Sequence, residues 1–149
     1  IARGALVGLT LRALPGAPPR PLRAIGGGDD LVHELGSSTD SFACATPTRL
    51  ARHGTALVND PESRWRLDLT KGRHRTSREP IDAGCPCPAC REHTRGYLHY
   101  LIRANELTAK RLITLHNLTF MAELMSAMRE AISTGGFDVF AERTLRGEP

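Results

Sequence analysis

The chain has 149 residues, of which 40% are apolar, 24% charged and 5% aromatic, and its formal net charge is +4. This composition excludes a wholly disordered chain, and the length excludes two domains of ordinary size. A membrane span is excluded as well, because the longest apolar-leaning stretch, residues 112–128, is interrupted by His116, Asn117 and Glu123. The chain starts at Ile1 without a signal-peptide pattern, so we expect a cytoplasmic protein cut from a longer one.

The basic residues are unevenly distributed. Residues 49–78 hold eight arginines and lysines against three aspartates and glutamates, whereas the rest of the chain is slightly acidic. Only two of the twenty basic residues are lysine. The planar guanidinium group of arginine suits bidentate contacts with phosphates and base edges. The distribution favours a nucleic-acid partner; on charge alone, a solvated loop and a genomic bias toward arginine are the alternatives.

The first predicted elements are a strand, a glycine turn and a helix start. An apolar patch at residues 5–11 is compatible with a strand that leads into a helix, and prolines then break regular structure up to residue 21. A short apolar run at residues 22–25 precedes Gly26, Gly27 and Gly28, after which an amphipathic helix is predicted. Free backbone N–H groups in such a turn can bind a phosphate or a polar base edge, or the glycines mark only a tight turn.

A second strand, a loop and a hairpin are predicted next. Residues 41–46 alternate small and apolar side chains and predict a short buried strand that stops at Pro47. Residues 48–54 are expected to form a loop that carries Arg49, Arg52 and His53. Residues 55–58 and 65–69 predict a hairpin, because turn-forming residues separate them.

From Cys90 onward the sequence has helical periodicity. A short apolar stripe is predicted near residues 97–102, and the pair Gly135 and Gly136 is expected to end a longer helix. The predicted core-facing stripe of that longer helix consists of Leu112, Leu115, Leu118, Ala122, Met125 and Ile132.

Three of the four cysteines, Cys85, Cys87 and Cys90, lie within six residues and are separated by prolines and one alanine. Three thiols at this spacing, without a secretory signal, argue against disulfides and for a metal. Zinc takes four nitrogen or sulfur ligands in a tetrahedron, and a site with four protein ligands is structural. An iron–sulfur cluster or a redox dithiol is the alternative.

The spacing leaves the fourth ligand open among His93, His99, His116 and Cys44. His116 lies 26 residues after Cys90, far enough for one helix to leave the cluster and the next to return. His93 would lie on the first turn of a helix at the cluster, where the geometry is tight. Cys44 is expected to pack as a small apolar residue in its strand.

The chain contains five short motifs whose order and spacing agree with those of one protein family: residues 40–44 (DSFAC), 47–54 (PTRLARHG), 85–90 (CPCPAC), 97–99 (YLH) and 115–118 (LHNL). Together they resemble the tRNA-guanine transglycosylase, or queuine tRNA-ribosyltransferase, family. These enzymes exchange a guanine in the tRNA anticodon for a 7-deazaguanine of the queuine or preQ1 type. The resemblance runs from residue 22 to residue 140.

The resemblance implies an α/β fold, the C-terminal portion of a TIM (β/α)8 barrel with an inserted zinc-binding subdomain and C-terminal helices. Residues 1–80 would supply late βα units of the barrel with RNA-binding loops, and residues 81–149 the zinc-binding subdomain and the helices. A complete barrel needs about 250 residues, so this chain would hold only its last portion. The family's general acid/base aspartate has no counterpart here.

The resemblance also implies site residues and partners. The zinc ligands of the family fall on Cys85, Cys87, Cys90 and His116. Gly4 would occupy the position of a substrate-contacting glycine. The implied partners are tRNA, a 7-deazaguanine base and a second copy or a related subunit, without DNA or a membrane. The anticodon-binding segments fall on Ala24, Ile25, Gly26, Gly27, Gly28, Asp29 and Asp30, and on Thr48, Arg49, Leu50, Ala51 and Arg52.

The nucleophile position departs from the family's pattern. In the family, an aspartate in the strand motif attacks C1′ of the target ribose and holds the tRNA covalently while the bases exchange. This chain has Ala43 at that position, and Asp40, the nearest carboxylate, is expected to face the other side of the strand. Two hypotheses follow: part of a tRNA-guanine transglycosylase, or a catalytically inactive, zinc-stabilised relative that binds tRNA or pairs with a subunit.

Overall fold

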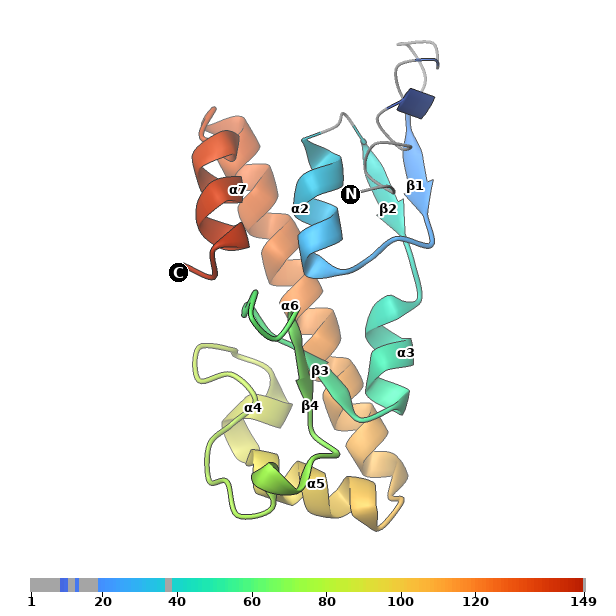
Figure 1. Cartoon of the computed structure of the whole chain (residues 1–149), viewed down its shortest axis with the longest axis vertical. Coiled ribbons are helices and arrows are strands. Elements are labelled where there is room, and N and C mark those ends of the chain that lie inside the picture. The colour runs from blue at the N-terminus through green and yellow to red at the C-terminus, as the bar shows by residue number, and fades with distance from the viewer. Residues whose placement is uncertain (1–8, 11–12, 14–18, 37–38, 149) are drawn as a thin grey trace.

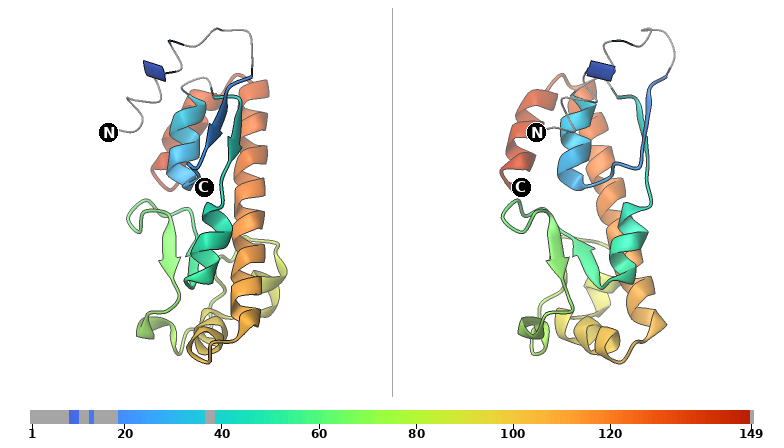
Figure 2. Two further views of the ribbon diagram at one scale, coloured as in Figure 1. Left: turned by 90° about the vertical axis from the view of Figure 1, so that its right-hand side faces the viewer. Right: turned by 45° about the vertical axis from the view of Figure 1, so that its right-hand side comes forward.

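The computed structural model describes residues 9–10, 13, 19–36 and 39–148. The longest element in them is α6 (Leu107–Ser133), which spans most of the height of the molecule in Figure 1. At 1.5 Å per residue, its 27 residues extend for about 40 Å. The other elements gather in two groups along α6, one beside each half, as both views in Figure 2 show. The described residues therefore form a mixed α/β structure.

The group beside the carboxyl-terminal half of α6 contains a βαβ unit. Strands β1 (Pro21–Arg23) and β2 (Ser41–Ala43) pair in parallel, with Arg23 opposite Ala43. The connection between them includes α2 (Gly28–Leu35), and α7 (Phe137–Leu145) packs against α2 and α6. The predicted order of strand, glycine turn and helix is confirmed. Gly4 and most of the patch at residues 5–11 lie outside the described residues.

The group beside the amino-terminal half of α6 contains the hairpin. Strands β3 (Thr55–Leu57) and β4 (Arg66–Asp68) pair antiparallel, which confirms the predicted hairpin. A 3₁₀ turn, η1 (Gly72–His74), follows the hairpin. Two helices, α4 (Pro88–Glu92) and α5 (Arg95–Arg103), then lead into α6.

The prediction of a loop at residues 48–54 is wrong. The strand ends at Ala43, and α3 (Thr46–Arg52) follows with Pro47 in its first turn. Proline is favoured there because its fixed φ suits a helix and its missing N–H would have no intrahelical partner. Pro47 therefore starts a helix, and Arg49 and Arg52 lie on that helix.

The predicted core-facing stripe of α6 is also wrong for most of its members. Leu112 is buried and Met125 is half-buried, but Leu115, Leu118, Ala122 and Ile132 are exposed. The helix carries apolar residues on two faces. The face that packs inward is not the one that carries Leu115 and Leu118. Its buried residues are Ala109, Leu112, Ile113, His116, Asn117, Leu124, Met128 and Ala131.

The buried side chains form two clusters, one in each group of elements. The first includes the three clustered cysteines with residues of α3, β3, α5 and α6. The second includes Leu31 and Val32 of α2, Leu124 and Met128 of α6, and Trp65 from the hairpin. Trp65 thus joins the hairpin to the other group. None of the helices in the described part of the chain combines the length and apolar character that a bilayer span needs.

Candidate functional site

Three cysteines and a histidine converge beside the amino-terminal half of α6. Cys85 and Cys87 precede α4, Cys90 lies in α4, and His116 lies in α6. One ligand atom from each lies within 4.8 Å of the others, and all four residues are buried. Cys87 is the N-cap of α4, and the Cys90 N–H donates to the Cys87 carbonyl at 3.1 Å. This turn brings the sulfurs of Cys87 and Cys90 to the same side.

The ring of His116 is held by a backbone hydrogen bond. Its Nε2 lies 2.8 Å from the carbonyl oxygen of Leu57 in β3. A carbonyl oxygen only accepts, so Nε2 carries the proton and Nδ1 has a free lone pair. Nδ1 lies 3.3 Å from Sγ of Cys90 and 3.8 Å from Sγ of Cys87. Around tetrahedral zinc, nitrogen and sulfur ligands are separated by about 3.5 Å, so these distances fit one ion.

The burial of the site favours the neutral forms of its ligands. Burial raises the pKa of the Cys85 thiol to about 11, and it also raises the pKa of the Cys90 thiol. Burial lowers the pKa of the His116 imidazole, which keeps the ring neutral and able to bind a metal. A dication would offset the cost of burying thiolates, and three sulfurs with one imidazole match zinc rather than a hard cation. The four residues form a buried site suited to zinc, as predicted.

The other candidates for the fourth ligand lie elsewhere. The His93 ring stacks on Tyr97, with ring centroids 5.1 Å apart. His99 is buried, with Nδ1 2.8 Å from the carbonyl oxygen of Leu69. Cys44 lies beside β2 in the other group of elements, and it is half-buried just after the strand, not buried within it as expected. His116 is therefore the histidine that the structure brings to the cysteines.

The glycine turn lies directly against the segment that links β2 to α3. The Ala24 N–H donates to the Ala43 carbonyl at 2.9 Å. A Cβ atom at Gly26 would overlap Sγ of Cys44 and would lie 3.4 Å from Oγ1 of Thr46, the first residue of α3. The glycine turn therefore meets the start of α3, the helix that carries the second predicted RNA-binding segment, at the carboxyl ends of two neighbouring parallel strands.

The start of α2 has an acidic environment. Gly27 is the N-cap, and a Cβ atom there would lie 2.7 Å from Oδ1 of Asp29 and 3.0 Å from Oδ2 of Asp30. Carboxylates are stabilised at a helix N-terminus, but they repel a phosphate. Of the two ligands that the sequence left open, a phosphate would therefore meet two carboxylates at this helix start.

Helix α3 presents its arginines to solvent. Arg49 and Arg52 are exposed, and their side chains make no hydrogen bond or ion pair within the described ranges. Leu50 is half-buried, Thr48 caps back to the Ala45 carbonyl at 3.1 Å, and Ala51 is fully buried in the first cluster. The guanidinium groups are therefore the side chains of this segment that are available to a polyanion.

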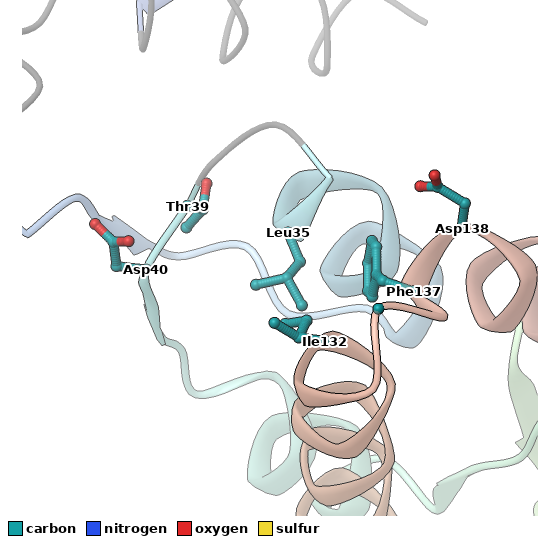
Figure 3. Close-up of a pocket in the computed structure, with 7 residues that line it drawn as sticks. Leu35, Thr39, Asp40, Ile132, Phe137 and Asp138 are labelled. Carbon is teal, nitrogen blue, oxygen red and sulfur yellow. The ribbon is translucent and has the colours of Figure 1, made fainter.

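Ala43 is the last residue of β2 and is exposed. Asp40 lies at the opposite, amino end of the strand, where its Oδ2 accepts a hydrogen bond from the Arg20 N–H at 2.7 Å. An open hollow of ≈ 460 Å³ lies at this amino end (Figure 3), away from the glycine turn. Its lining residues are Leu35, Thr39, Asp40, Ile132, Gly135, Phe137 and Asp138.

Comparison with known proteins gives the family. A family model described as "Queuine tRNA-ribosyltransferase" matches residues 4–149. The queuine tRNA-ribosyltransferase of Roseiflexus sp. (strain RS-1) is 44% identical over 132 residues, which is 89% of this chain and 33% of the relative. This chain belongs to the queuine tRNA-ribosyltransferase family. The namesakes from Synechococcus sp. (strain CC9311) and Deinococcus radiodurans are 45% and 42% identical, over 83% and 91% of this chain.

The family assignment confirms the resemblance drawn from the five segments. The chain spans about a third of the length of the curated queuine tRNA-ribosyltransferases that it matches, since it covers 33%, 32% and 33% of these three relatives. The activity, substrates and partners of the whole enzyme are therefore proposals for this chain.

Sequence reasoning missed Asn117, the neighbour of His116. Its Oδ1 accepts from the Leu57 N–H at 2.8 Å, and its Nδ2 donates to the Pro47 carbonyl at 2.9 Å and to the Thr55 carbonyl at 3.2 Å. With the His116 bond to Leu57, these bonds satisfy the edge of β3 that faces away from β4. Asn117 therefore connects α6 to the hairpin and to the first turn of α3. A polar pair inside an apolar helical stretch was the available signal.

Proposed function

We propose that the chain is the zinc-binding, C-terminal part of a tRNA-guanine transglycosylase. The enzyme would exchange a guanine in the tRNA anticodon for a 7-deazaguanine of the queuine or preQ1 type, a step in the queuosine modification of tRNA. The observation that carries this proposal is the meeting of the glycine turn and α3 at the carboxyl ends of β1 and β2. In barrel enzymes, the residues that act on substrate lie at this end of the strands.

The two segments would divide the RNA contacts between them. The exposed Arg49 and Arg52 would contact the backbone and base edges of the anticodon loop. The segment from Ala24 to Asp30, with its two carboxylates, would accept hydrogen bonds from a base or a ribose. Gly4 remains a predicted contact to the 7-deazaguanine.

Zinc would serve structure and not catalysis. Cys85, Cys87, Cys90 and His116 fill four positions and leave none open for substrate. The His116 bond to Leu57 and the Asn117 bond to Pro47 would connect the zinc site to the hairpin and to α3, so that zinc binding would hold both in place. Its contribution to function would be the placement of Arg49 and Arg52.

Ala43 favours a second candidate, a non-catalytic relative. A methyl group cannot attack C1′ of a ribose, and Asp40 is engaged at the other end of β2. A chain with Ala43 would therefore bind RNA without forming the covalent intermediate. Loss of such a nucleophile lowers the rate by on the order of 10⁴ or more.

The remaining parts of the proposal concern the barrel and the partners. β1 and β2 would be adjacent strands of a TIM barrel, with late βα units in residues 1–80 and the zinc-binding subdomain and helices in residues 81–149. A second copy would cover the exposed apolar side chains of α6, among them Leu118 and Ile132. We place the protein in the cytoplasm with its tRNA, and assign it no DNA or membrane partner.

Two measurements test the function. The zinc-loaded chain should bind an anticodon stem-loop RNA, and failure to bind would remove the RNA assignment. For catalysis, the chain would be joined to the missing part of the Roseiflexus relative and incubated with tRNA and 9-deazaguanine. A denaturing gel should show a covalent adduct for Ala43→Asp and none with Ala43 in place. An adduct with Ala43 would show that another group attacks the ribose, and its absence from both would favour the non-catalytic relative.

A further inference from the structure

Trp65, in the segment that connects the two strands of the hairpin, packs against the start of α2. The residue directly precedes β4, yet only 3% of its surface is exposed. Its ring packs edge-to-face on Phe120 of α6, with centroids 6.1 Å apart and planes at 84°, and it belongs to the same buried cluster as Leu31 and Met128. Figure 1 shows the hairpin turn beside the start of α2.

The backbone adopts an uncommon conformation to place this ring. Arg64 and Trp65 have φ values of 55° and 61°, in the left-handed region that non-glycine residues rarely adopt. Three backbone hydrogen bonds hold the turn: Arg64 N–H to Pro61 O at 3.0 Å, Trp65 N–H to Asp60 O at 2.8 Å, and Val58 N–H to Trp65 O at 3.2 Å. A glycine would meet the backbone requirement at residue 65 without strain. The left-handed φ is therefore unfavourable for tryptophan at residue 65, which indicates that its side chain has a role there.

The ring lies on the first residue of α2. A Cβ atom at Gly28 would collide with the six-membered ring of Trp65. Gly28 ends the glycine turn, whose other end is packed on Cys44 through Gly26. The turn is thus supported on two sides, by Trp65 from the hairpin and by the segment after β2.

We propose that Trp65 is a positioning residue for RNA binding: from the hairpin, its ring sets the place of the glycine turn at residues 26–28. This inference rests on the proposed function, because the glycine turn is there assigned to the RNA. It makes the hairpin, which the His116 bond to Leu57 ties to the zinc site, a support for a segment in the other group of elements.

The test uses the zinc-loaded 149-residue chain and two readouts. The first is the affinity for an anticodon stem-loop RNA. The second is the rate at which iodoacetamide alkylates Cys44, measured on its peptide by mass spectrometry, since Gly26 packs against that thiol. In Trp65→Ala, alkylation should be several-fold faster and RNA affinity about tenfold weaker, as expected when one good base interaction is removed. Trp65→Phe, which keeps an aromatic ring, should have an alkylation rate and an RNA affinity close to those of the unsubstituted chain.

Met128→Ala is the matched control, because Met128 is fully buried in the same cluster but is not among the nearest neighbours of the glycine turn. It should destabilise the chain and leave both readouts near their original values. Trp65→Gly, which relieves the left-handed φ, should behave like Trp65→Ala if the ring is what matters.

Each outcome decides a separate point. Equal alkylation in Trp65→Ala and Met128→Ala would overturn the inference. Faster alkylation with unchanged RNA affinity would overturn it too, because the turn would then move without consequence for RNA. If the unsubstituted chain binds no RNA, the proposed function fails, and a Cys44 rate that rises only in Trp65→Ala and Trp65→Gly still supports the placement of the turn by Trp65.

Discussion

Replacing Asn117 by alanine should strongly destabilise the chain, because one side chain satisfies three backbone groups from two other elements. The amide accepts from the Leu57 N–H at 2.8 Å and donates to the carbonyls of Pro47 at 2.9 Å and Thr55 at 3.2 Å. The residue is fully buried, so water does not replace these bonds without opening the structure.

The size of the effect follows from the number of groups left without their partner. A buried polar group that loses its hydrogen bond costs about 1–3 kcal/mol. The Leu57 N–H has one hydrogen to donate and should cost the most, whereas each carbonyl retains a second lone pair. We therefore expect a loss of about 3–5 kcal/mol, a large share of the roughly 5–15 kcal/mol that stabilises a typical domain. The unfolding temperature should fall by about 10 °C or more.

The measurement is urea unfolding of the zinc-loaded chain, followed by circular dichroism. Thr119→Ala is the control on the same helix, because the Thr119 hydroxyl donates within α6 itself, to the Leu115 carbonyl at 3.0 Å. It should change the free energy of unfolding by no more than about 0.5 kcal/mol. If Asn117→Ala came within about 1 kcal/mol of this control, the three bonds would not carry the stability assigned to them.

Three further predictions concern the metal, the RNA and the partner. Cys87→Ser should reduce bound zinc well below one ion per chain in metal analysis, because a neutral hydroxyl replaces a thiolate ligand; a full equivalent of zinc would contradict the ligand set. Arg49→Ala with Arg52→Ala should weaken binding of the anticodon stem-loop and flatten its salt dependence, by about one unit of slope for each phosphate that no longer has a guanidinium partner, and unchanged binding would show that these arginines serve another purpose. Leu118→Glu should leave the fold intact, because 48% of Leu118 is exposed, and should yield a monomer in analytical ultracentrifugation if α6 pairs with a second copy; a persistent dimer would place the interface elsewhere.

The elements that the sequence predicted well have local chemical causes. Three successive glycines followed by two aspartates specify a turn and a helix start, and the structure has its helix from Gly28. Turn residues between two apolar runs specify the hairpin. The zinc site was predictable because three thiols at short spacing have few other uses in a chain of this kind. Choosing His116 as the fourth ligand needed the resemblance to a family, since spacing alone left His93 and His99 open.

Pro47 shows why a local signal can be read in two ways. Proline is compatible with the end of a strand and with the first turn of a helix, and the residues around it were not decisive. In the structure, the buried Ala51 packs in the first cluster, and Asn117 donates to the Pro47 carbonyl. Both interactions involve residues distant in the sequence, which is why α3 was mistaken for a loop.

The wrong prediction of the core-facing stripe of α6 has a physical cause, which the polar pair His116 and Asn117 reveals. The helix has two apolar faces, and periodicity does not say which of them meets the core. Polar residues such as His116 and Asn117 ordinarily lie on the outer face, but a metal ligand must face its metal, and the edge of β3 needs hydrogen-bond partners. Both polar residues are therefore buried, and the face that carries Leu115 and Leu118 is turned outward. In a helix that supplies a structural metal ligand, the ligand identifies the inner face, and the apolar stripe opposite it is the surface available to another chain.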